Sequence, residues 1–292
     1  MFPLSSRLSS GMNRTLRAAV GRAGLAGATM LLLLVGGCVS RQIVTQQPVS
    51  QQAGEVTRPE LVTASDETPG RRRARIRVEL ASGYFENDKS TVALDEVKLA
   101  IAADPDYAPA YSLRGLIYMR LNDFDLASDS FRRAATLNPR DADTLQNHGW
   151  LMCQQRRFDE ADRLFTQAAN MPGYANRPKT LMTQGLCQAR AGRAAQSEAT
   201  LTAAYELDPA NPIVGYTLAN MQFQRGDMSQ ARFYIRRVNN GEFATSESLW
   251  LGMRVERRMG DSVALAQLGD QLRKRFPQSR EAALFERGVF DE

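Results

Sequence analysis

Histidine is almost absent from this sequence, which has a single His in 292 residues, at position 148. A His-based metal cluster and a helix carrying two zinc-binding histidines are therefore excluded. The sequence also lacks a glycine-rich phosphate loop and a Gly-x-Ser-x-Gly nucleophile elbow. His148 is expected to have a structural role, and carboxylate pairs such as Asp159 and Glu160 are expected to be solvated or capping residues. These absences predict a protein that is not an enzyme and that has no cofactor, metal or small-molecule substrate.

An excess of positive charge is also missing from most of the chain. The formal net charge is +5, but four arginines and no acidic residue lie in residues 1–37, which leaves +1 for the remainder. These arginines are Arg7, Arg14, Arg17 and Arg22. The basic balance therefore reflects the amino terminus, and no nucleic-acid partner is expected.

Residues 25–35 form an apolar run that is too short to span a bilayer and that follows the basic residues, a pattern typical of a cleaved signal peptide. Val35, Gly36, Gly37 and Cys38 come next and resemble a bacterial lipobox, although Val35 stands where the usual leucine is expected. The resemblance implies a signal peptide over 1–37 and a covalent N-acyl and S-diacylglycerol lipid on Cys38. In Gram-negative lipoproteins an Asp after the cysteine typically retains the protein in the inner membrane, so Val39 favours the periplasmic face of the outer membrane. A conventional signal peptide with an incidental cysteine is the alternative.

Residues 38–70 contain the cysteine and a polar segment rich in Gln, Ser and Pro, which predicts a flexible linker with a reach of roughly 30 Å. The run Arg71, Arg72, Arg73 and Arg75 closes this segment. It is expected to be the solvated start of a helix, with contact to acidic headgroups or to a partner as the alternative.

The rest of the sequence repeats every 34 residues, a period marked by Asp104-Pro105, Asn138-Pro139, Asp208-Pro209 and Phe276-Pro277 with a two-residue insertion within 171–177. This is the length of a tetratricopeptide repeat. The predicted fold class is all-α, a superhelical solenoid of about six helix-turn-helix repeats in residues 71–287. The repeats are expected at about 74–107, 108–141, 142–177, 178–211, 212–245 and 246–279, followed by a capping helix that begins after Ser279 and a tail at 288–292.

Small residues at positions 8 and 20 of each repeat face a larger residue at position 24, so that the two helices of a repeat can approach closely. Position 8 has Ala81, Gly115, Gly149, Gly185 and Ala219; position 20 has Ala93, Ala127, Ala161, Ser197 and Ala231; position 24 has Val97, Phe131, Phe165, Leu201 and Ile235. The sixth repeat departs from this pattern, with Leu265 and Gly269 at positions 20 and 24. A terminal repeat is expected to be atypical because one of its sides faces water.

Cys153 and Cys187 fall on the first helices of neighbouring repeats, at positions 12 and 10. An oxidising compartment would permit a disulfide between them. Because a two-residue offset turns side chains about 200° apart on a helix, we expect two buried, unpaired thiols.

Positions 5, 9 and 12 share one face of each first helix, the side that lines the concave surface of such solenoids. Apolar and aromatic residues recur there, which suits a helix or an extended peptide laid in a groove. Packing against neighbouring helices alone is the alternative. The candidate groove residues are Val78, Phe85, Leu116, Met119, Gln146, Trp150, Met182, Leu186, Tyr216 and Phe223.

Three segments add to the lipobox and the repeats: Leu145-Gln146-Asn147-His148-Gly149-Trp150-Leu151, Met171-Pro172-Gly173-Tyr174, and Val238-Asn239-Asn240-Gly241 leading into Ser248-Leu249-Trp250-Leu251-Gly252. With them, the sequence from about Arg75 to Glu286 resembles the PilF/PilW family of type IV pilus biogenesis lipoproteins, the pilotins of the pilus secretin. The resemblance implies a protein that binds secretin subunits and promotes their outer-membrane localisation and oligomerisation. Another periplasmic tetratricopeptide lipoprotein, serving β-barrel assembly or the cell envelope, is one alternative. An enzyme or an enzyme activator that acts on peptidoglycan is another.

Overall fold

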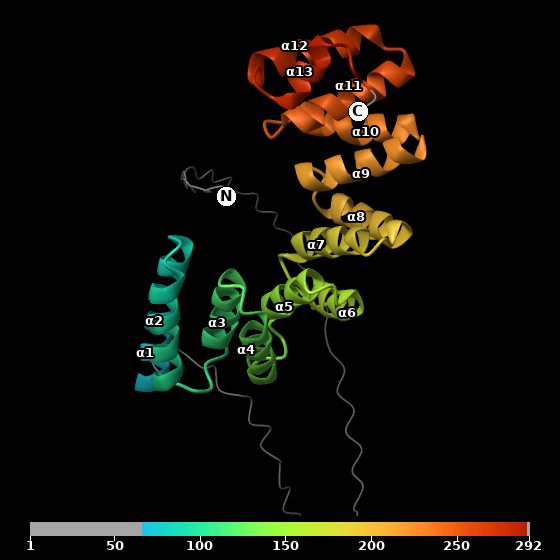
Figure 1. Cartoon of the computed structure of the whole chain (residues 1–292). Helices are drawn as coiled ribbons and strands as arrows, with labels where there is room; N and C mark the ends of the chain where they lie inside the picture. Colours follow the sequence, from blue (N-terminus) through green and yellow to red (C-terminus); the bar gives the residue numbers. More distant parts are fainter. Residues whose placement is uncertain (1–65, 291–292) are drawn as a thin grey trace, which may run out of the picture. The chain divides into compact units, whose positions relative to one another are not determined.

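The computed structural model describes residues 66–290, in which all regular secondary structure is helical and no strand occurs. The predicted leader, Cys38 and almost the whole predicted linker lie outside the described residues. None of the described helices is both long enough and apolar enough to cross a bilayer. The helices, labelled in Figure 1, are α1 (Pro69–Glu86), α2 (Ser90–Ala103), α3 (Ala108–Arg120), α4 (Phe124–Leu137), α5 (Ala142–Gln154), α6 (Phe158–Ala169), α7 (Arg177–Arg190), α8 (Ala194–Leu207), α9 (Pro212–Arg225), α10 (Met228–Asn239), α11 (Ser246–Met259), α12 (Ser262–Arg275) and α13 (Arg280–Glu286).

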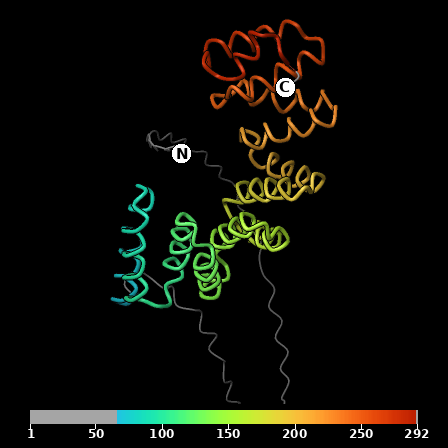
Figure 2. Tube along the Cα trace, viewed as in Figure 1, coloured from blue at the N-terminus to red at the C-terminus, as the bar shows by residue number. Residues whose placement is uncertain are grey.

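The helices pack in consecutive pairs, from α1 with α2 to α11 with α12. The second helix of each pair also contacts the first helix of the next pair, so one pair follows another along the chain (Figure 2). The short helix α13 packs against α11 and α12. This architecture confirms the predicted all-α solenoid of six helix-turn-helix repeats with a capping helix.

Local sequence signals set the helix boundaries. The second helices α2, α4 and α8 each end two residues before the proline that marks the period, because proline cannot continue a helix. The predicted cap of α13 is confirmed, since the Ser279 hydroxyl accepts a hydrogen bond of 3.1 Å from the Ala282 N–H. The arginine run lies in the first turns of α1, where Arg75 pairs with Glu67 at 3.2 Å and with Glu79 at 3.0 Å.

A left-handed residue occupies the same place in the turn inside every pair. Asn, Asp and Gly tolerate this backbone conformation, and they supply it in five repeats. In the third repeat the position is Arg156, with φ of 61°. The other five residues are Asp88, Asn122, Gly192, Gly226 and Gly260.

The predicted close approach of the paired helices is present in the core. A Cβ atom added at Gly115 would lie 2.6 Å from the Phe131 ring, and one added at Gly185 would lie 2.6 Å from Leu201. Phe131 and Leu201 are fully buried. The glycines therefore let the first helix rest directly on the large side chain of the second.

The sixth repeat follows the same rule one residue earlier than predicted. Gly252 faces Leu268, whose Cδ1 would lie 3.2 Å from an added Cβ, and the spacing of sixteen residues equals that between Gly115 and Phe131. Leu265 and Gly269 therefore do not occupy the consensus positions at which they were expected. Gly269 instead receives the ring of Phe285 from α13, which would lie 2.4 Å from a Cβ at that position. A glycine is needed there for the capping helix to dock.

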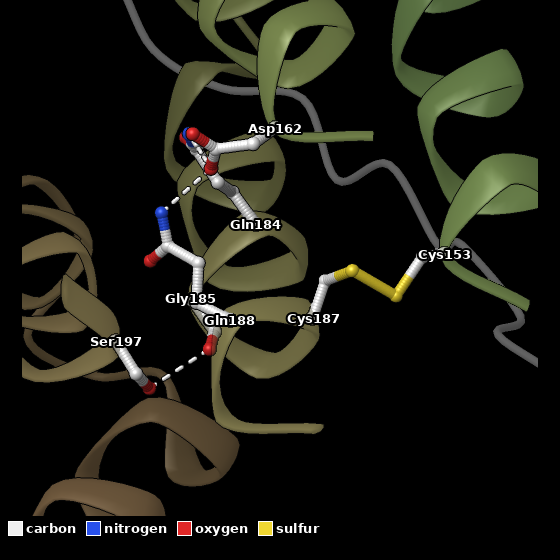
Figure 3. Close-up of a disulfide and its surroundings, with 7 residues drawn as sticks. All are labelled: Cys153, Asp162, Gln184, Gly185, Cys187, Gln188 and Ser197. Atoms are coloured by element: carbon white, nitrogen blue, oxygen red, sulfur yellow. Dashed lines mark hydrogen bonds between the residues drawn. A yellow bond between two sulfur atoms is a disulfide. The ribbon is translucent and has the colours of Figure 1, made fainter. Parts of the chain in front are cut away.

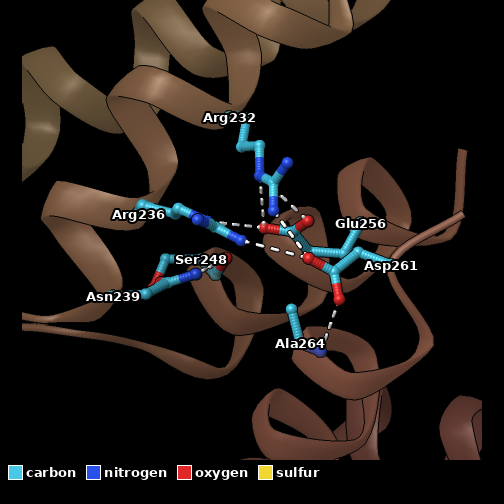
Figure 4. A network of polar contacts seen from close by, with 7 residues as sticks. All are labelled: Arg232, Arg236, Asn239, Ser248, Glu256, Asp261 and Ala264. Carbon is cyan, nitrogen blue, oxygen red and sulfur yellow. Dashed lines mark hydrogen bonds and ion pairs between the residues drawn. The ribbon is translucent and has the colours of Figure 1, made fainter. Parts of the chain in front are cut away.

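A buried carboxylate joins the fifth repeat to the sixth (Figure 4). Glu256 on α11 is 1% exposed, and its Oε1 accepts hydrogen bonds from the Nε of Arg232 at 3.2 Å and the Nε of Arg236 at 2.8 Å. Arg232 also donates to Asp261 at 2.7 Å, and Asp261 accepts from the Ala264 N–H at 3.0 Å as the N-cap of α12. The Ala264 N–H and the two arginines hold the pKa of Asp261 below its usual range. The network thus connects α10 with α11 and with the beginning of α12.

Candidate partner-binding surface

The ten predicted groove residues lie on the five first helices α1, α3, α5, α7 and α9, two on each. Eight of them are half-buried, whereas Gln146 and Phe223 are buried, at 7% and 5% exposure. Gln146 and Phe223 are therefore not open contact residues, contrary to the prediction. The other eight offer partial side-chain surface to a partner.

Seven of the eight half-buried residues also pack against the core. Val78 and Phe85 contact the cluster around Val97 and Ile117. Leu116, Met119 and Trp150 contact the cluster that contains Phe131 and Phe165. Met182 and Tyr216 contact the cluster around Leu218 and Ile235. Each of these side chains thus has a packing role as well as an exposed part, so the packing alternative holds for part of each residue.

Arginines from the following repeat cover three of the aromatic residues on this face. The guanidinium carbon of Arg120 lies 3.6 Å from the ring centroid of Phe85, and that of Arg190 lies 5.9 Å from the centroid of Trp150. Phe223 is covered by Arg254 and Arg258, at 4.7 and 4.3 Å. These distances are within the range of cation–π attraction. These arginines are not among the predicted groove residues, although Arg120, Arg190 and Arg258 recur at position 13 of repeats two, four and six, directly after the groove positions.

The two cysteines form a disulfide, with Cα atoms 6.0 Å apart (Figure 3). The prediction of unpaired thiols was wrong, although both residues are buried as expected, at 0% and 3% exposure. An angle between two side chains predicts their separation only when both are measured on the same helix. Neighbouring first helices lie side by side, so two residues that face each other must leave their helices on opposite sides. An offset of about 200° is therefore what a bridge between α5 and α7 requires.

Helix α7 is also held by polar contacts to α6 and α8, which Figure 3 shows. Gln184 and Gln188 both donate to one carboxylate oxygen of Asp162 on α6, at 2.9 and 2.7 Å. The Ser197 hydroxyl of α8 donates to the Gly185 carbonyl at 2.8 Å. Helix α7 is therefore joined to α5 by the disulfide and to α6 and α8 by hydrogen bonds.

The predicted insertion forms a loop that is fastened to the first turn of α5. The hydroxyl of Tyr174 donates to Asp143 at 2.8 Å, and the Asn176 amide donates to the same oxygen at 3.1 Å. Burial raises the pKa of Tyr174 to about 12. These two hydrogen bonds hold the loop between the third and fourth repeats against α5.

His148 has the structural environment that the sequence predicts. Its ring stacks on Phe131 with centroids 5.7 Å apart, and its Nε2 lies 3.5 Å from the Ser128 hydroxyl. Burial lowers the pKa of His148 to about 4, with Arg132 and Arg157 acting in the same direction. Among residues 66–290, no group of three His, Cys, Asp or Glu side chains is arranged to hold a metal ion.

The lowered pKa of His148 predicts that acid weakens the fold. In the unfolded chain His148 becomes protonated below about pH 6.5, whereas in the folded chain it stays neutral until about pH 4. The free energy of unfolding therefore falls as the pH falls through this window. From pH 7 to pH 5 the loss from this residue is expected to be on the order of 1 kcal/mol. Urea unfolding at both pH values should show a smaller loss in His148→Gln than in the unmodified chain. Equal losses would contradict the assignment.

Comparison with known proteins agrees with this geometry. The tetratricopeptide repeat family model matches residues 108–141. The type IV pilus assembly protein PilF of Pseudomonas aeruginosa is 26% identical over 231 residues, which span 77% of this chain and 92% of PilF. The solved structure of Pseudomonas aeruginosa PilF has the same fold, with a TM-score of 0.67 at 23% identity over 76% of this chain and 100% of that chain. The crystal structure of PilW, a type IV pilus biogenesis factor, matches with a TM-score of 0.62 at 26% identity over 73% of this chain and 98% of that chain. The chain is a PilF/PilW-like tetratricopeptide-repeat protein.

Proposed function

We propose that this chain is an outer-membrane-anchored pilotin, which binds subunits of the type IV pilus secretin and promotes their localisation and oligomerisation. The observation that carries the proposal is the similarity to PilF along 92% of that protein. The likeness to PilW, at 26% identity, supports the same process. Both similarities support a role in type IV pilus biogenesis, and the tetratricopeptide fold is typical of proteins that act by binding other proteins.

The membrane anchor in this proposal is the lipid on Cys38. Three acyl chains, at about 0.8 kcal/mol per buried CH₂, exceed what stable anchoring needs. The disulfide between Cys153 and Cys187 supports export, because disulfides persist in oxidising compartments such as the periplasm. Val39 after the lipidated cysteine favours the outer membrane.

The proposed mechanism is physical rather than chemical. The anchor gives membrane affinity, and residues 38–70 give the binding surface its reach. The half-buried apolar residues on the first helices hold a secretin subunit until it oligomerises. The anchor raises the effective concentration of captured subunits at the membrane where they must assemble.

A pull-down from detergent-solubilised envelopes tests this function. The tagged, lipidated chain is expected to enrich the pilus secretin over an equally abundant lipoprotein that carries the same tag. Enrichment of β-barrel assembly proteins or of peptidoglycan enzymes in place of the secretin would contradict the proposal and favour one of the alternatives.

The lipid anchor has its own test in Cys38→Ala. This variant is expected to lose all labelling by a clickable palmitate analogue and to leave the outer-membrane fraction, because no acyl chain is attached. The variant Cys153→Ala/Cys187→Ala is the control and should keep both labelling and fractionation. If Cys38→Ala is still labelled, the lipid is attached elsewhere.

A further inference from the structure

Three first helices of the solenoid carry basic residues and no acidic ones. Helices α3, α7 and α9 contain no Asp or Glu, and their charged residues are Arg114, Arg120, Arg177, Lys179, Arg190 and Arg225. The second helices α4, α6 and α8 carry seven acidic residues and three arginines, which leaves them a net negative charge; the acidic residues are Asp125, Asp129, Asp159, Glu160, Asp162, Glu198 and Glu206, and the arginines are Arg132, Arg133 and Arg163. The net charge of the whole chain does not reveal this separation.

The arginines that cover the groove residues differ in their partners. Arg120 also donates to Asp88 at 3.1 Å. Arg190, Arg254 and Arg258 have no carboxylate within ion-pair distance in residues 66–290, and their guanidinium groups rest on Trp150 and Phe223. Each aromatic ring belongs to the repeat before that of the arginine, so these pairs bridge α5 to α7 and α9 to α11.

A guanidinium held over an aromatic face keeps N–H donors at its edge for an anion. These stacked arginines are therefore positioned in advance to donate to carboxylates, and the half-buried Leu116, Met119 and Leu186 on neighbouring helices offer apolar contact. Basic and apolar groups on one face complement an acidic segment with apolar side chains.

We propose that the surface formed by the groove residues and the arginines that cover them binds an acidic, apolar peptide segment of a partner protein. Arg190, Arg254 and Arg258 pair with the carboxylates of this segment. This inference rests on the proposed function and specifies the chemistry of the secretin segment held. The paired carboxylates sit beside the aromatic rings, while the apolar side chains of the segment contact the exposed parts of the groove residues.

The test uses the full lipidated chain in detergent and a fluorescein-labelled peptide of fifteen residues in which Asp and Glu alternate with Leu and Phe. A second peptide has Asn and Gln at the acidic positions. Anisotropy should show that the acidic peptide binds at least tenfold more tightly and that added salt weakens it. Equal affinity for the two peptides would overturn the proposal.

Variants locate the site. Arg190→Gln/Arg254→Gln/Arg258→Gln should weaken acidic-peptide binding at least tenfold. The control Arg140→Gln/Arg163→Gln/Arg237→Gln changes the net charge equally at exposed arginines elsewhere and should have little effect. The conservative Arg190→Lys/Arg254→Lys/Arg258→Lys should recover part of the affinity, which separates loss of charge from loss of fold. Equal weakening by the control triple would overturn the proposal.

Two further results separate this inference from others. If the glutamine triple loses binding to vesicles of phosphatidylglycerol and phosphatidylethanolamine but still binds the acidic peptide, the face recognises lipid headgroups and the proposal fails. If the unmodified chain captures the secretin and the glutamine triple captures it equally well, this inference fails while the pilotin function stands. If the unmodified chain binds the acidic peptide but no secretin, the pilotin function fails instead.

Discussion

Replacing Arg232 and Arg236 together by methionine is expected to lower the free energy of unfolding of the carboxyl-terminal repeats by about 3 to 5 kcal/mol. Glu256 is 1% exposed, and these two arginines are its charged partners among the described residues. Removing them leaves a buried carboxylate whose charge has no compensation (Figure 4). The penalty should exceed that of any single exposed ion pair in the chain.

A third substitution makes this expectation sharper. Adding Glu256→Leu to the double variant removes the stranded charge, and the triple variant should recover to within about 1 kcal/mol of the unmodified chain. The matched control is Arg273→Met, because Arg273 donates from its Nε to Glu286 at 2.6 Å with side chains 50% and 59% exposed. This control should cost less than about 1 kcal/mol.

Hydrogen exchange at the amides of α11 and α12 is the suitable measurement, because repeat arrays open locally and a global melt would average the effect. Urea unfolding followed by circular dichroism should show an early transition in the double variant alone. If the triple variant is as unstable as the double, the loss comes from packing rather than from the buried charge.

Loss of the disulfide is the second large effect. Cys153→Ala/Cys187→Ala should lower the free energy of unfolding by about 3 to 4 kcal/mol, because the bridge closes a loop with a sequence separation of 34 residues. Reduction should destabilise the unmodified chain by a similar amount and leave the double variant unchanged. Urea unfolding with and without a reductant measures both.

The bridge itself is checked by alkylation. In unreduced, denatured protein, peptides that carry Cys153 and Cys187 should remain unmodified, and both should react after reduction. Reaction of both residues before reduction would show that the purified protein has no bridge.

The sequence was sufficient for the repeat, because each local signal acts within one pair of helices. Gly115 and Phe131 face each other at a fixed spacing, and a proline ends α2, α4 and α8 by its own covalent structure. The cap at Ser279 is equally local. These features need no knowledge of how one repeat meets the next.

Contacts between repeats were beyond the same reasoning. The disulfide was missed because facing residues on neighbouring helices must point in opposite directions in their own frames. The sequence pattern predicts Phe223 as a groove residue, yet Phe223 is buried and covered by Arg254 and Arg258 from the following repeat. A signal for this network is present in the sequence: Glu256 shares a helix face with Leu249 and Met253, and Arg232 and Arg236 share one face of α10 at a spacing of four.

The register of the sixth repeat and the turn at Arg156 show a different limit. Counting from Pro277 placed the consensus positions one residue late, because the count assumes that the length from the small residue to the proline is constant. Arginine at position 156 gives no sign of a left-handed backbone, as glycine or asparagine would. Only comparison with the turns of the other repeats would have identified this position.

Photo-crosslinking in cells tests most directly the claim that the first helices hold the secretin. p-Benzoylphenylalanine would replace Trp150, Leu186 or Tyr216 on the first helices, and Leu99, Leu126 or Phe233 on the second helices. The last three are exposed, at 47%, 42% and 59%, and serve as controls. Secretin adducts are expected from the first set and none from the second. Adducts confined to the second set, or their absence from both, would contradict it.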